Sequence, residues 1–128
     1  MEKPHKRLIV WQRAREFVRE VYRATQDFPG TEKYGLTSQI RRAAVSILAN
    51  LSEGAARQGT AEFIQFVHTA MGSCSEVDAL LEISCELGFL EEKTWRELDQ
   101  RISEIDRMLV GLRNYLRRKQ ASRAGKSS

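Results

Sequence analysis

The chain has 128 residues, of which 41% are hydrophobic and 30% are charged, proportions typical of a soluble globular protein with one domain. Its net charge of +4 comes from the two ends, because residues 117–128 hold five cations and no acid, whereas residues 8–116 hold 13 basic and 16 acidic residues. No apolar run approaches the roughly 18 residues of a membrane-spanning helix, and no signal peptide is recognisable. We therefore expect a cytoplasmic protein.

Two amphipathic helices are predicted in the first half. The first covers residues 9–27 and ends before Pro29 and Gly30. Its apolar arc consists of Val10, Trp11, Ala14, Phe17, Val18, Val21, Tyr22 and Thr25. The second begins near Thr37 or Ser38, either of which can cap its first turn. Its core face consists of Leu36, Ile40, Ala43, Ala44, Ile47 and Leu51.

Two longer helices follow a break at residues 54–59. The third covers residues 60–87, and Gly88 suits a left-handed cap at its end. Its main face consists of Phe63, Val67, Ala70, Met71, Cys74, Val77, Leu81 and Cys85. The fourth runs from Glu91 or Glu92 to Arg117, with a stripe of Trp95, Leu98, Ile102, Ile105, Leu109, Leu112 and Leu116.

Four long helices with short connections predict an all-α fold, an antiparallel up-and-down four-helix bundle over residues 9–117. A basic N-terminal segment (residues 1–8) precedes it. A basic tail (residues 118–128) follows, and we expect this tail to be disordered. The tail's charge also favours anionic partners.

The third helix carries more apolar residues than one core requires. Leu80, Ile83 and Leu87 lie on a second arc, and Phe66 also lies off the main face. A second apolar stripe predicts contact with another subunit, and hence a homo-oligomer. The alternative is a broad helix face buried within one subunit.

A polar stripe runs along the second helix, through Arg42, Ser46, Asn50, Glu53 and Arg57. In one interpretation these side chains form a structural network that fixes the helix register, with Glu53 and Arg57 paired. In the other, the two arginines bind phosphates.

Asp78 falls on the apolar face of the third helix. A buried carboxylate needs a partner, and we expect Arg41 or Arg42 to be that partner. This would make Asp78 part of the structural polar network.

A basic row of Arg15, Arg19 and Arg23 lies on the outer face of the first helix, with Glu16 and Glu20 beside it. The row is either a solvated face whose charges pair with one another or a strip that contacts nucleic-acid phosphates.

No catalytic constellation is recognisable. His5 and His68 are isolated in the sequence, and Cys-x-x-Cys, glycine-rich phosphate-loop and Gly-x-Ser-x-Gly motifs are absent. Cys74 and Cys85 would lie about 16 Å apart along one helix, too far for a disulfide, so free thiols are expected. We predict no enzymatic activity, no metal and no cofactor.

Several motifs together carry a resemblance to a known family. They are residues 10–12 (VWQ), 28–29 (FP), 34–47 (YGLTSQIRRAAVSI), 50–54 (NLSEG), 72–76 (GSCSE) and 87–90 (LGFL). Over about residues 8–116 the chain resembles the four-helix-bundle proteins named after 23S rRNA intervening sequences. Where many members have proline this chain has Leu48, and where many have glutamine it has Leu80.

The resemblance implies a ring-like homopentamer in a prokaryotic cytoplasm. It also relates the fold to accessory variability proteins of diversity-generating retroelements, which bind nucleic acid and a reverse transcriptase. By this analogy, the leading hypothesis is non-specific binding of RNA or DNA by a non-enzymatic oligomer. The candidate contacts are Arg15, Arg19, Arg23, Arg41, Arg42, Arg57, Arg117, Arg118 and Lys119.

The alternative hypothesis is a scaffold that binds a protein partner. Residues 61–106 hold three basic and eleven acidic residues, a net charge of −8. Such a surface repels nucleic acid and attracts a basic protein.

Overall fold

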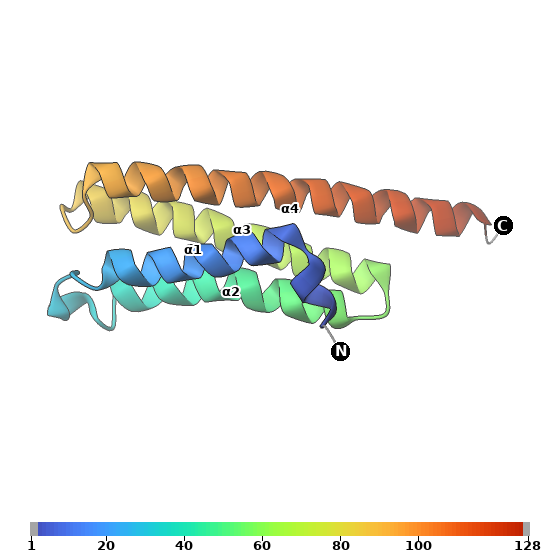
Figure 1. The fold of residues 1–128 in the computed structure, drawn as a ribbon, viewed down its shortest axis with the longest axis horizontal. Coiled ribbons are helices and arrows are strands. Elements are labelled where there is room, and N and C mark those ends of the chain that lie inside the picture. Colours follow the sequence, from blue (N-terminus) through green and yellow to red (C-terminus); the bar gives the residue numbers. More distant parts are fainter. Residues whose placement is uncertain (1–2, 127–128) are drawn as a thin grey trace.

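The computed structural model describes residues 3–126 and contains four long helices (Figure 1). They are α1 (Ile9–Thr25), α2 (Leu36–Ala56), α3 (Thr60–Glu86) and α4 (Glu92–Lys126), with short 3₁₀ turns η1 (Pro4–Arg7) and η2 (Gly30–Glu32). No strand occurs in this described part of the chain. The prediction of an all-helical, four-helix fold is confirmed.

Each helix packs beside two others: α1 contacts α2 and α4, and α3 contacts α2 and α4. In Figure 1 the α1–α2 and α3–α4 connections lie at one end of the molecule, and the α2–α3 connection lies at the other. Among residues 3–126, no helix is both long and apolar enough to cross a membrane.

The core contains the apolar arcs predicted from the sequence. Its largest fully buried apolar side chains are Phe17, Ile40, Ile47, Leu51, Leu81, Ile105 and Leu109. Tyr22 differs from the prediction, because 42% of its surface is exposed and its ring lies against Arg41 outside the core. Cys74 is buried and Cys85 is half-buried, and both are free thiols. Burial and the charge of Asp106 raise the pKa of the Cys74 thiol to about 12.

Two helix ends show how local chemistry sets the boundaries. Helix α2 begins at Leu36, with Gly35 at the N-cap, so the predicted cap by Thr37 or Ser38 is wrong. The backbone N–H of Leu36 donates to Oε1 of Glu32 at 3.4 Å. Gly88 has a φ of 82°, which confirms the predicted left-handed cap. There the N–H of Phe89 donates to the carbonyl of Ser84 at 2.9 Å, as in a Schellman motif.

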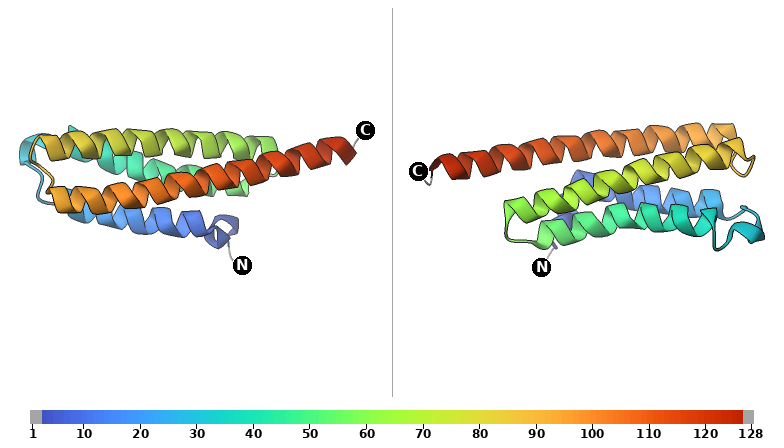
Figure 2. Two further views of the ribbon diagram at one scale, coloured as in Figure 1. Left: turned by 90° about the horizontal axis from the view of Figure 1, so that it is seen from above. Right: turned by 180° about the vertical axis from the view of Figure 1, so that it is seen from behind.

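Helix α4 continues to Lys126, nine residues beyond its predicted end at Arg117. It extends past the other helices as a single arm (Figures 1 and 2). Residues 118–126 are therefore helical here and not a disordered tail; residues 127–128 of the predicted tail lie outside the described part. Residues 118–124 contain Arg, Lys, Gln, Ala and Ser and no proline, so nothing in the local sequence stops the helix at Arg117.

Candidate functional site

Arg41 is held in place by α1 at the end of the bundle where α1 joins α2. Its Nε donates to Oγ1 of Thr25 at 2.8 Å, and its Nη2 donates to the carbonyl of Tyr22 at 3.3 Å. The guanidinium carbon lies 4.5 Å from the centroid of the Tyr22 ring. Thr25 is buried and donates its own hydroxyl to the carbonyl of Val21 at 2.8 Å. Arg41 is therefore oriented before any ligand arrives.

A hollow of about 440 Å³ lies next to Arg41. It is lined by Tyr22, Lys33, Tyr34, Thr37, Ser38, Arg41, Arg42 and Val45. None of these lining residues is acidic, and the neighbouring Glu32 directs Oε1 to the N–H of Leu36. The hollow thus combines three cations with four hydroxyl groups.

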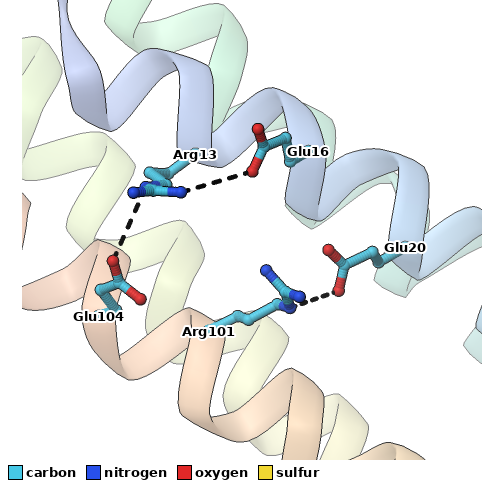
Figure 3. Close-up of polar contacts among 5 residues, drawn as sticks. All are labelled: Arg13, Glu16, Glu20, Arg101 and Glu104. Carbon is cyan, nitrogen blue, oxygen red and sulfur yellow. Dashed lines mark ion pairs between the residues drawn. The ribbon is translucent and has the colours of Figure 1, made fainter.

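Ion pairs join α1 to α4, and one further pair lies within α1 (Figure 3). Glu20 lies 2.7 Å from Nε of Arg101, while Arg13 lies 3.8 Å from both Glu16 and Glu104. Burial raises the pKa of Glu20, and the charges of Arg101 and Arg23 offset this only in part. The ion pairs of Glu16 and Glu20 therefore lead to Arg13 and Arg101 instead of to the predicted basic row.

The three arginines of the predicted basic row lie on two different surfaces. Arg15 and Arg19 are exposed and stand at i and i+4 to each other, and Tyr22 follows at i+7, so the three share one stripe of α1. This stripe leads to the hollow that Tyr22 lines. Arg23 instead lines a separate hollow with Glu20 and Arg101. We call Arg15, Arg19, Lys33, Arg41 and Arg42, together with Tyr22 and Tyr34, the α1–α2 basic face.

The remaining candidate cations lie towards the opposite end of the bundle. Arg57 pairs with Glu53 at 3.9 Å and lies 5.1 Å over the Phe66 ring. It lines a hollow of about 270 Å³ that Lys119 of α4 also lines. Arg117 and Arg118 are exposed on the same arm, where Nη2 of Arg117 lies 3.5 Å from Nε2 of His68. The predicted phosphate contacts therefore form two groups, and Arg23 lies apart from both.

A polar network joins α2 to α3. Nδ2 of Asn50 donates to the carbonyl of Ser46 at 2.8 Å and to its hydroxyl at 3.0 Å, and the Ser73 hydroxyl lies 2.9 Å from that of Ser46. These contacts favour the structural interpretation for Ser46 and Asn50. Glu53 contributes only its ion pair with Arg57. Ser73, which is buried, was not predicted, because one serine beside Gly72 gives no sequence signal of a cross-helix contact.

The predicted pairing of Asp78 with Arg41 or Arg42 is wrong. Asp78 is exposed and lies beside Asp99 of α4, in a hollow of about 370 Å³ that Asp106 and Arg107 also line. Partial burial, a hydrogen bond with Asp99 and the charges of neighbouring acids raise the pKa of Asp78. The error arises because Asp78 lies at the edge of the α3 apolar arc, on the side of α4 and not of α2. Among residues 3–126, no three His, Cys, Asp or Glu side chains are arranged to hold a metal.

This carboxyl pair leads to a pH-dependent prediction. The folded state raises the pKa of Asp78 above its ordinary value of 3.8. Asp78 therefore stabilises the folded state when it is protonated at low pH, and this stabilisation is lost as the pH rises through its folded-state pKa. Asp78→Asn should therefore raise the Tm at pH 7, and the gain should shrink towards pH 4. Thermal unfolding followed by circular dichroism measures this, with Glu62→Gln as the control. An equal shift at both pH values, or a lower Tm at pH 7, would contradict the assignment.

Most of the chain matches one known protein family. Residues 6–111 match the family model described as 23S rRNA-intervening sequence protein. The chain belongs to this family. The predicted resemblance is thereby confirmed over most of the chain.

A crystal structure of another such bundle supports the same fold. It is that of a protein of unknown function from the S23 ribosomal protein family of Bacteroides thetaiotaomicron, with 21% sequence identity and a TM-score of 0.74. The match covers 81% of this chain and 97% of that one. No curated protein matches the chain. At this identity the likeness concerns the fold alone.

In this member of the 23S rRNA-intervening sequence protein family, the predicted oligomer residues differ in exposure. Leu80 packs against the hydrophobic core of the chain itself, and Phe66 is half-buried beneath Arg57. Ile83 and Leu87 remain 39% and 54% exposed. Of the predicted set, these two are therefore the most accessible to another subunit.

Proposed function

We propose that this protein is a non-enzymatic helical-bundle protein that binds nucleic acid non-specifically through the α1–α2 basic face. The observation that carries the proposal is the hollow with three cations and no acid, reached by a stripe that adds Arg15 and Arg19. Phosphate groups bind lysine and arginine without reading a base sequence. The absence of a catalytic role rests on the sequence motifs alone.

The uneven distribution of charge supports the choice of face. Residues 61–106, which lie mostly in α3 and α4, carry a net charge of −8. Such a surface repels a polyanion and would orient the protein with α1 and α2 towards it. Five phosphate contacts would give a slope of log affinity against log salt of about −3.5 to −4.5.

Fluorescence anisotropy of labelled RNA and DNA across a salt series tests the proposal. The matched variant replaces Arg117, Arg118 and Lys119 with glutamine, which removes three charges from the α4 arm. We expect the affinity of the wild-type protein to fall with salt, and we expect this variant to bind with a similar affinity. Affinity that does not change with salt, or that disappears with the arm charges, would overturn the assignment to the α1–α2 basic face.

We further propose that the antiparallel bundle assembles into a ring-like homo-oligomer, a pentamer by family resemblance, in the cytoplasm. The exposure of Ile83 and Leu87 on α3 supports assembly, since each would bury apolar surface against a second copy. Ile83→Glu with Leu87→Glu should reduce the mass measured by light scattering after size exclusion to that of a smaller species. Ile9→Glu, at another exposed apolar residue, should not. An unchanged mass would exclude this stripe from the interface.

A scaffold that binds a basic protein is the second candidate function. It is favoured by the same net charge of −8 in residues 61–106 and by the cluster of Asp78, Asp99 and Asp106 around one hollow. Electrostatic complementarity would then select a cationic partner. Pull-downs from a nuclease-treated lysate and from an untreated lysate test this candidate. Recovery of a basic protein from the treated lysate would support it. Recovery of nucleic acid alone from the untreated lysate would count against it.

A further inference from the structure

The hollow on the α1–α2 basic face contains more than positive charge. Its volume of about 440 Å³ falls in the range of roughly 300–1,000 Å³ that is usual for small-molecule sites. Besides Lys33, Arg41 and Arg42, it is lined by the aromatic rings of Tyr22 and Tyr34. A merely solvated charged surface requires neither a concave shape nor aromatic walls.

The two rings differ in availability. The ring of Tyr22 is covered on one side by the guanidinium of Arg41, at 4.5 Å. Tyr34 is 88% exposed, and its contact is with the Lys33 ammonium, 5.5 Å from the ring centroid. Burying an aromatic ring releases free energy, so a tyrosine left almost fully exposed beside cations offers a surface for a planar group to stack on.

The cations are arranged around an organised centre. Arg41 uses Nε and Nη2 for Thr25 and Tyr22, so its orientation is set before a ligand binds. Because these hydrogen bonds use Nε and Nη2, Nη1 of Arg41 can still donate to a ligand. Arg42 is exposed on the next position of α2, and the hydroxyls of Thr37 and Ser38 line the same hollow. A phosphate group needs such convergent donors.

We propose that this hollow binds one nucleotide of a single-stranded nucleic acid. Lys33, Arg41 and Arg42 hold the phosphate, and the base stacks on Tyr34. The identification of the ligand as part of a strand rests on the proposed function. A single strand is favoured because a base inside a duplex is already stacked on its neighbours and cannot lie against Tyr34.

The test compares single-stranded and duplex RNA of equal length by fluorescence anisotropy at one salt concentration. Tyr34→Ala should weaken binding of the single strand about tenfold, the loss of one stacked base, and change duplex binding less than twofold. Tyr34→Phe should retain both affinities because it keeps the ring. Tyr115→Ala is the matched control, since Tyr115 is 53% exposed on α4. Circular dichroism verifies that each variant is folded.

The charge contribution is tested separately. Lys33→Gln with Arg42→Gln should weaken single-strand binding more than Arg96→Gln with Arg107→Gln, which removes two charges from α4. Arg41 is left unchanged in this test because it also ties α2 to α1. If Tyr34→Ala weakens both RNA forms equally or neither, or if the two double variants behave alike, the proposed site is wrong.

A failure of the proposed function would be distinguishable. If the wild-type protein binds neither RNA form, isothermal titration with adenosine monophosphate, adenosine and inorganic phosphate tests the hollow alone. If adenosine monophosphate binds the wild-type protein and does not bind the Lys33→Gln, Arg42→Gln variant, a site for free nucleotides is upheld. The absence of monophosphate binding would overturn the inference. RNA binding that Lys33→Gln with Arg42→Gln weakens, but that Tyr34→Ala leaves unchanged for both RNA forms, would reject the nucleotide site and leave the proposed function in place.

Discussion

Gly54→Leu should lower the free energy of unfolding by about 3 kcal/mol, the upper end of the usual cost of overpacking. A Cβ atom at Gly54 would lie 2.8 Å from Cδ1 of Phe63 and 2.8 Å from Cβ of Phe66. The Phe66 Cβ is tied directly to the α3 backbone, so the two helices would have to separate. Gly54→Ala should cost less, about 1 kcal/mol, because the better helix propensity of alanine offsets part of the clash.

Substitution of a glycine in α4 should change the free energy of unfolding in the opposite direction. Gly111 in α4 is exposed, and a Cβ there would meet nothing within 4 Å. Gly111→Ala should therefore raise the free energy of unfolding by about 0.5–1 kcal/mol. Urea unfolding of the three variants at one protein concentration measures both effects. Stabilisation by Gly54→Ala comparable to that by Gly111→Ala would show that α2 and α3 do not approach as closely as described.

Removing three cations from the α1–α2 basic face should weaken nucleic-acid binding at least tenfold at 0.1 M salt. The variant is Arg15→Gln, Arg19→Gln and Arg42→Gln, which spares Arg41 and its contacts with α1. Because each phosphate contact releases about 0.7–0.9 counterions, the slope of log affinity against log salt should become shallower by about 2–3. Anisotropy across a salt series measures both quantities.

The matched control removes the same charge from α4. It carries Arg96→Gln, Arg107→Gln and Arg113→Gln, so its net charge equals that of the α1–α2 variant. Arg96 makes only an exposed ion pair with Glu92, and such pairs contribute little to stability. Similar slopes for the two triple variants would mean that binding depends on the total charge of the protein and that the α1–α2 basic face is not the binding site.

The fold was predictable because it depends on the spacing of apolar residues along the sequence. Apolar residues at helical spacing marked all four helices, and turn residues such as Pro29 and Gly88 marked their limits. The end of α4 was missed although residues 118–124 favour a helix, because terminal segments of a chain are often disordered. Position at the chain end and helix propensity favoured different structures there, and helix propensity agrees with the structure.

The site was less predictable because it depends on how the helices rotate against one another. Arg41 was expected to pair with Asp78, but its Nε donates to Thr25. Glu20 pairs with Arg101, a residue 81 positions away, instead of an arginine on its own helix. Spacing along one helix defines a face, whereas the side chain opposite that face is set by packing between helices.

The most direct test of the account is to locate the nucleic acid on the protein by photocrosslinking. Single-stranded RNA containing 4-thiouridine would be irradiated with the full-length protein, and the crosslinked peptides would be identified by mass spectrometry. We expect crosslinks at Tyr22 and Tyr34 and in the flanking parts of α1 and α2. Crosslinks confined to residues 113–126 of the α4 arm, or to α3, would contradict binding through the α1–α2 basic face.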